Sequence, residues 1–155
     1  MRVLMTVYGA FSEEGEYRTY YDLVFTDLGL FIVFLGRMPR IFKRRPPLPR
    51  GIERQLLRVY KERFREAYNS KGLNELVRMG RARFVRWSEI SYVVIKEVGI
   101  PLPPVLRRAS GDEKERVLML ALAMGRDMPR FYTSVKIREG IKRALKSIGV
   151  ELRYS

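Results

Sequence analysis

Apolar and polar side chains alternate over the first part of the chain with the period of two that a β-strand has. Residues 2–11 show this alternation, and residues 17–37 show it on either side of the turn Thr26-Asp27-Leu28-Gly29. The pattern predicts three consecutive antiparallel strands. The strand after the turn is apolar on both faces, which is typical of a central strand covered on both sides. We therefore expect the rest of the chain to pack around it.

Prolines and a helical period replace the alternation in the middle of the chain. Four prolines within residues 37–50 exclude a regular helix or a central strand there and favour an extended connection. Residues 51–69 place apolar side chains on one side of a helix, and residues 73–79 predict a shorter helix that ends at Gly80. Together they predict a helical insertion over residues 51–79.

Strand character returns after the insertion. Residues 84–87 and 90–98 are rich in aromatic and β-branched side chains, which predicts two strands. Residues 113–124 leave two alternatives open. Ser110 and Glu113 form the pattern of a capping box and favour a helix, whereas the following turn and the strand predicted at 130–135 favour a hairpin.

The end of the chain has a clear helical stripe. Residues 137–148 predict a helix that ends at Gly149, because their apolar side chains recur every three or four positions. The last residues, 150–154, allow a short final strand.

Composition narrows the class of protein. A chain of 155 residues with 46% hydrophobic side chains suits one domain with its own core. No apolar run approaches the roughly 20 residues of a membrane span, and the first residues read as a strand rather than as a signal peptide, so we expect a single cytoplasmic domain. The absence of cysteine and the excess of arginine over lysine suit a thermophilic protein.

The chain also lacks histidine, which excludes imidazole bases and, together with the lack of cysteine, nearly every transition-metal site. We expect no cofactor, no bound metal and no catalysis. A metal-dependent nuclease is the remote alternative. Asp112-Glu113-Lys114 resembles part of such a site, but a second carboxylate must face the same metal, and the sequence does not place Asp22 or Asp27 there.

The net charge of +14 is concentrated in one region. Residues 37–86 hold 16 basic and 4 acidic side chains, whereas residues 1–36 hold 2 and 5. A localised positive field attracts polyanions. The alternative is that the charge serves only solubility and surface ion pairing.

The candidate anion-binding residues lie in this basic region. They are four cations on the polar side of the expected helix and three in the proline-rich connection: Arg54, Arg58, Lys61, Arg65, Lys43, Arg44 and Arg45. Arg81, Arg83 and Arg86 next to Trp87 add possible phosphate contacts, with Trp87 as a candidate for base stacking. The alternative to anion binding is that the cationic side of the helix is only solvated and that the proline-rich stretch is only a surface connection. The alternative to base stacking is that Trp87 lies in the core.

Three stretches of the chain resemble pleckstrin-homology-like and GRAM-like domains. They are the hairpin Tyr21-Asp22-Leu23-Val24-Phe25-Thr26-Asp27 with Leu30-Phe31-Ile32-Val33, the turn Arg86-Trp87-Ser88-Glu89-Ile90 with the strand after it, and residues 131–145. The resemblance covers roughly 1–36 and 82–149. It departs at the insertion, 37–81, and at Gly29, where such hairpins often carry a basic residue.

The resemblance implies an α+β fold. The expected form is an antiparallel pleckstrin-homology-like barrel, or a strongly bent sheet, with the helical insertion at 51–79 and a C-terminal helix. It also implies a binding scaffold rather than an enzyme, without naming the ligand. We therefore expect a non-catalytic binding module with a basic face for an anionic partner, in the first place nucleic acid. The alternatives are an anionic membrane surface and an acidic protein.

Overall fold

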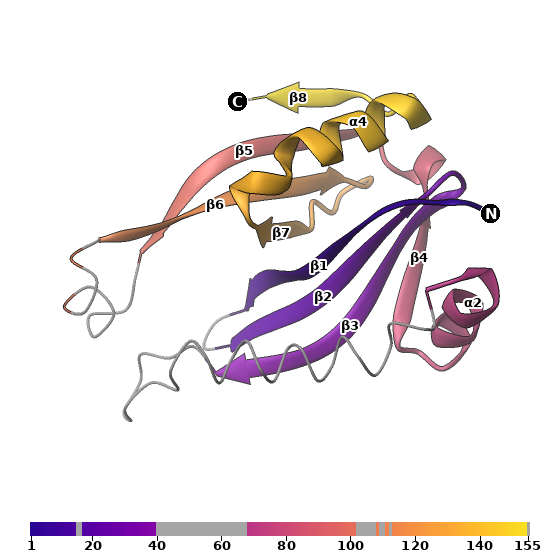
Figure 1. Ribbon diagram of the computed structural model, residues 1–155, viewed down its shortest axis with the longest axis horizontal. Helices are drawn as coiled ribbons and strands as arrows, with labels where there is room; N and C mark the ends of the chain where they lie inside the picture. Colours follow the sequence, from indigo (N-terminus) through magenta and orange to yellow (C-terminus); the bar gives the residue numbers. More distant parts are fainter. Residues whose placement is uncertain (15–16, 40–67, 102–107, 109–110, 112, 155) are drawn as a thin grey trace.

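The alternating segments fold into a single sheet. The computed structural model describes residues 1–14, 17–39, 68–101, 108, 111 and 113–154, and within them eight strands follow one another in the sheet in the order β4-β3-β2-β1-β7-β6-β5-β8 (Figure 1). The strands are β1 (Val3–Glu14), β2 (Tyr17–Thr26), β3 (Gly29–Pro39), β4 (Ala82–Arg86), β5 (Tyr92–Pro101), β6 (Lys114–Ala123), β7 (Arg130–Thr133) and β8 (Leu152–Tyr154). The two described α-helices are α2 (Ser70–Arg78) and α4 (Arg138–Ile148).

The first four strands form an antiparallel meander, and its first three strands are those that the alternation predicts. The β2–β3 turn is held by the hydroxyl of Thr26, which donates to the carbonyl of Gly29 at 2.7 Å and accepts from its N–H at 3.0 Å. A Cβ at Gly29 would collide with the ring of Phe84 and with the carbonyl oxygen of Val85. The facing strand β4 therefore excludes the basic residue that the family resemblance leads one to expect at Gly29.

The remaining strands form the second half of the sheet. β5 and β6 pair antiparallel over ten residues, β7 continues from β6, and β8 lies parallel to β5. Residues 114–123 are therefore a strand, and the hairpin alternative is confirmed. Pairing with β5 and burial of side chains on both faces outweigh the helix propensity of the local sequence.

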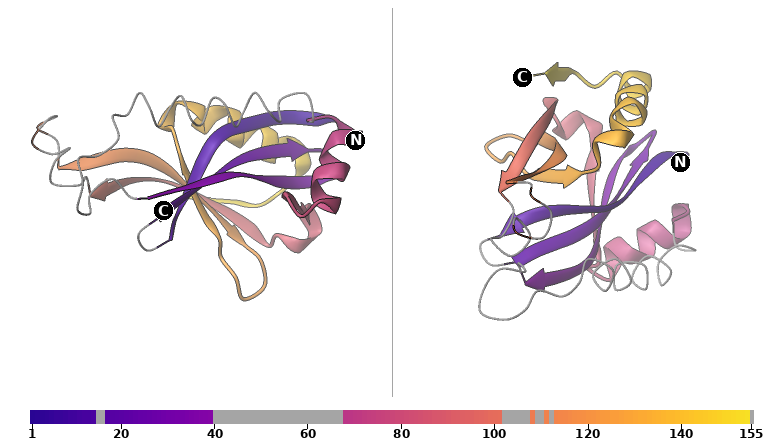
Figure 2. Two further views of the ribbon diagram at one scale, coloured as in Figure 1. Left: turned by 90° about the horizontal axis from the view of Figure 1, so that it is seen from below. Right: turned by 60° about the vertical axis from the view of Figure 1, so that its left-hand side comes forward.

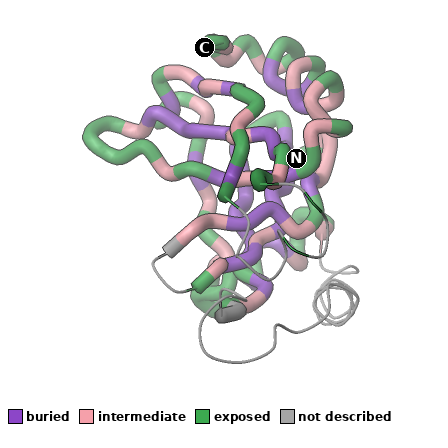
Figure 3. Tube along the Cα trace, turned by 90° about the vertical axis from the view of Figure 1, so that its left-hand side faces the viewer, coloured by how far each residue is buried: buried purple, intermediate pink, exposed green. Residues whose placement is uncertain are grey.

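The main core lies between the two halves of the sheet, where α4 packs its buried side chains Ile141, Ala144 and Leu145. We call this side of the sheet the inner face. On the outer face of β2 and β3, Leu73 and Leu76 of α2 cover Val24, Phe31 and Val33. The right-hand view of Figure 2 shows the two helices on opposite sides of the first strands, and Figure 3 shows the buried positions along the strands. Coverage of β3 on both faces is thus confirmed.

α2 and α4 both end next to the glycines that the sequence predicts as helix stops. α2 is capped by Asn69, whose side chain accepts from the N–H of Gly72 at 2.8 Å, and Gly80 follows it with a φ of 72°. α4 ends at Gly149, which takes a left-handed φ of 83°. These conformations favour glycine because it lacks a Cβ.

The expectation of a closed antiparallel barrel is wrong. The sheet is open, because β4 and β8 lie at its two ends and do not pair with each other, and it is mixed, because β8 runs parallel to β5. The predicted insertion 51–79 is described only from residue 68 onward, where α2 confirms its second helix. Residues 40–67 lie outside the described residues, and so do 102–107 in the second proline-rich stretch.

Candidate ligand-binding groove

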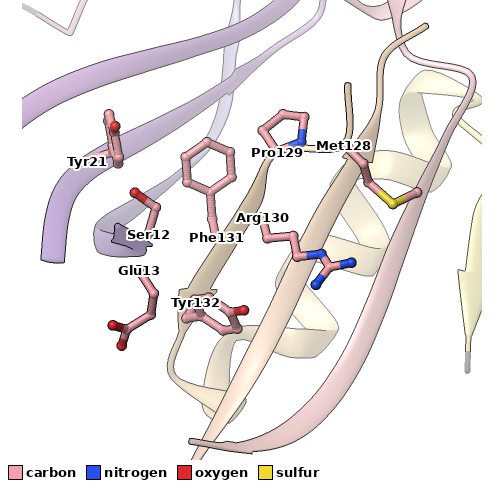
Figure 4. Close-up of a pocket in the computed structure, with 8 residues that line it drawn as sticks. All are labelled: Ser12, Glu13, Tyr21, Met128, Pro129, Arg130, Phe131 and Tyr132. Carbon is pink, nitrogen blue, oxygen red and sulfur yellow. The ribbon is translucent and has the colours of Figure 1, made fainter. Parts of the chain in front are cut away.

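Among the described strands, a single residue pair joins the two halves of the sheet: Phe11 of β1 pairs with Tyr132 of β7. Beyond this pair the strands diverge and leave a hollow of about 410 Å³ (Figure 4). Its lining comes from both sides of the gap: Ser12, Glu13 and Tyr21 on one side, and Met128, Pro129, Arg130, Phe131 and Tyr132 on the other.

Two further hollows continue this one into a groove. One, of about 300 Å³, shares Tyr21, Pro129 and Phe131 with it and extends along the inner face of β3 and β4. The other, of about 440 Å³, shares Glu13, Arg130 and Tyr132 and extends over the outer side of β5 and β6. Each hollow is near the lower end of the size range of small-molecule pockets. The continuous groove therefore suits an elongated ligand better than a compact one.

Aromatic rings line the inner part of the groove. Tyr21 meets the ring of Phe131 edge to face, with centroids 5.4 Å apart, and that of Phe34 in the same way at 6.2 Å. Phe131 is buried, whereas Phe34 is 40% exposed although it lies on the same face of β3 as the buried residues Leu30 and Ile32. The row thus runs from an exposed ring, Phe34, to a buried one.

Arginines also line these hollows. Arg83 of β4 pairs with Ile32, two residues before Phe34, and lines the same hollow as Phe34. Arg130 precedes Phe131 in β7, points to the opposite side and lines the two hollows on either side of Tyr132 (Figure 4). Both are exposed, and neither forms an ion pair within the part of the chain that the structure describes. Arg81 also lines the groove. Within the described residues, the groove therefore offers two cations, Arg83 and Arg130, that no ion pair neutralises.

One carboxylate in the groove is already neutralised. Glu13 accepts from the Nε of Arg18 at 2.8 Å, and Arg18 also reaches Glu115 at 3.6 Å. The guanidinium of Arg18 lies 4.4 Å from the centroid of the Phe11 ring, which holds it in place. Glu13 therefore adds little repulsion toward an anionic ligand.

The predicted anion-binding residues lie outside the described residues: Lys43, Arg44, Arg45, Arg54, Arg58, Lys61 and Arg65. Their role stays a prediction. Of the cations predicted near Trp87, the structure brings Arg81 and Arg83 into the groove, while Arg86 does not line it.

Trp87 is half-buried and packs against the main core. Its ring stacks on Phe25 with centroids 5.9 Å apart, and its indole N–H donates to the carbonyl of Thr26 at 2.8 Å. The structure thus gives Trp87 the core position that the sequence left as the alternative to stacking. The groove has other rings that the sequence analysis did not select: Tyr21, Phe34, Phe131 and Tyr132.

The two aspartates considered for a nuclease do not face one another. Asp22 is buried and accepts from the N–H of Gly9, while Asp27 lies about 16 Å away, in the turn after β2, and accepts from the N–H of Arg2. Within the described ranges, no group of three acidic side chains could hold a metal ion.

No family model and no curated protein matches the chain. The resemblance to pleckstrin-homology-like domains therefore stays a prediction. In the described part of the chain, no helix is long and apolar enough to cross a membrane.

Proposed function

We propose that the protein is a nucleic-acid-binding module and that the groove between the halves of its sheet is the binding site. One observation carries the proposal: adjoining hollows are lined by a row of aromatic rings, Phe34, Tyr21 and Phe131, and by the exposed cations Arg83 and Arg130. Aromatic rings bind bases by stacking, and arginines bind phosphates. The net charge of +14 adds a long-range attraction for polyanions.

The test is a salt titration of binding to a fluorescent oligonucleotide. The variant carries Arg83→Gln and Arg130→Gln. Both side chains are exposed and form no ion pair within the described residues, so the fold should tolerate the change. For a single strand, each lost phosphate contact lowers the slope of log K against log salt by about 0.7, so the double variant should lose about 1.4.

The matched control carries Arg143→Gln and Lys146→Gln. These residues are exposed on α4 and do not line the groove, and the control loses the same net charge. It should keep nearly the full salt slope. Equal losses in both variants would show that binding follows net charge alone. Binding to anionic vesicles without binding to the oligonucleotide would overturn the proposal in favour of a membrane surface.

A further inference from the structure

The aromatic row leaves ring faces available to a ligand. Tyr21 makes interplanar angles of 69° with Phe34 and 87° with Phe131, so none of these contacts is a parallel stack. An edge-to-face contact occupies at most one face of each ring. Phe34, with 40% of its surface exposed, is the accessible member of the row.

Only an unpaired base can use such a ring. In a duplex the faces of the bases are stacked on one another, and the surface presents phosphates and the edges of the bases. Side chains stack on bases where the strand is single and the bases are splayed out. The phosphates of a duplex could reach Arg83 and Arg130, but a duplex would place no base on the exposed ring of Phe34.

We infer that the groove selects single-stranded over double-stranded nucleic acid, with a base stacked on Phe34 and phosphates held by Arg83 and Arg130. This inference rests on the proposed function and specifies its ligand. Stacking is tolerant of base identity because every base has a π-face, so we expect little sequence preference.

The experiment compares two substitutions at one exposed position. Phe34→Leu keeps an apolar side chain but removes the ring, whereas Phe34→Trp keeps a ring that can stack. The probes are labelled oligo-dT and oligo-U of about 16 nucleotides, near the upper end of the site size of one small binding domain, and a hairpin duplex with the same number of phosphates. The two single strands show whether DNA or RNA binds better.

Phe34→Leu loses one stacked base, so its affinity for the single strands should be about 5- to 150-fold lower than that of the parent. Phe34→Trp should bind within about threefold of the parent, because tryptophan also offers a flat aromatic face. Neither substitution should change binding to the duplex, which does not reach the ring. Circular dichroism of each variant shows that the fold is intact.

The outcomes separate this inference from the proposed function. Equal binding of single strand and duplex, unchanged by Phe34→Leu but weakened by the Arg83→Gln and Arg130→Gln variant, would overturn the single-strand selection and keep the groove as a nucleic-acid site. Absence of binding to every probe would overturn the proposed function itself. Equal weakening of single-strand binding by Phe34→Leu and Phe34→Trp would show that the ring does not act by stacking.

Discussion

The hydrogen bond between Tyr68 and Asp22 allows a sharp test of how the sheet is held to the segment that enters α2. Asp22 is fully buried in β2 and accepts from the hydroxyl of Tyr68 at 2.5 Å and from the N–H of Gly9 at 2.8 Å. Gly9 reaches it because β1 bulges there and the residue takes a φ of 67°. Tyr68→Phe removes one donor from a buried carboxylate while keeping the ring.

Hydrogen bonds to charged groups contribute about 1.5–3 kcal/mol to the free energy of unfolding. For a domain of this size, that loss corresponds to a fall of roughly 3–12 °C in Tm for Tyr68→Phe. Urea unfolding followed by circular dichroism measures the free energy directly. A value within about 0.5 kcal/mol of the parent, the range of a neutral surface substitution, would refute the reasoning.

A double-mutant cycle identifies the partner of the hydroxyl. Asp22→Asn removes the charge with almost the same shape, so Tyr68→Phe should cost less in that background than in the parent. Additive effects of the two substitutions would mean that Tyr68 stabilises the fold without the help of Asp22.

The same pair predicts how stability depends on alkaline pH. Burial, followed by the hydrogen bond to Asp22, raises the pKa of Tyr68 above its ordinary value. The folded state therefore holds the phenol proton more tightly, and this contribution is complete below about pH 10 and is lost as the pH rises further, by about 1.4 kcal/mol per unit. Tyr68→Phe should remove this part of the slope, measured as the urea midpoint against pH. Equal slopes in parent and variant would contradict the assignment.

Three further predictions concern single positions. Gly29→Ala should lower the free energy of unfolding by about 1–3 kcal/mol because the new methyl group meets the carbonyl oxygen of the facing strand β4, and urea unfolding measures the loss. Gly140→Ala should instead raise the free energy of unfolding by about 0.5–1 kcal/mol, because the position is helical and has room for a Cβ. A lower free energy of unfolding would contradict the packing at this site. The backbone N–H of Arg2 is the largest cause that lowers the pKa of Asp27, so this carboxylate stabilises the fold above about pH 4 and less as the pH falls. An NMR titration that gives Asp27 an ordinary pKa would exclude the hydrogen bond.

The parts of the fold that follow from local pattern could be predicted from the sequence. The β2–β3 hairpin, α2 and α4 each combine a clear period with a turn or a glycine at the end. β6 could not be decided in this way, because residues 114–123 contain good helix formers and become a strand only through pairing with β5. The open edges at β4 and β8 depend on which distant strands meet, and no local pattern encodes that.

The groove was not predictable for a related reason. Its residues come from strands β1 to β7 and from the turns before β4 and β7, and most of them have an ordinary place in a strand pattern. Phe34 continues the inner face of β3 and reads as one more core residue. Only the three-dimensional arrangement shows that it is exposed while Ile32, two positions earlier, is buried.

One feature of the sheet accounts both for the failed barrel prediction and for the groove. Among the described strands, the halves are joined by one residue pair, Phe11 and Tyr132, so they are free to diverge on the side of β7 where the groove begins. A closed barrel would turn Phe34 and Tyr21 into core residues beneath continuous strands. In the open sheet Phe34 stays 40% exposed, and its exposed surface adds nothing to the core, since apolar surface is stabilising when it is removed from water. The exposed ring of Phe34 shares its hollow with Arg83, which forms no ion pair within the described residues, and this arrangement supports the proposed binding site.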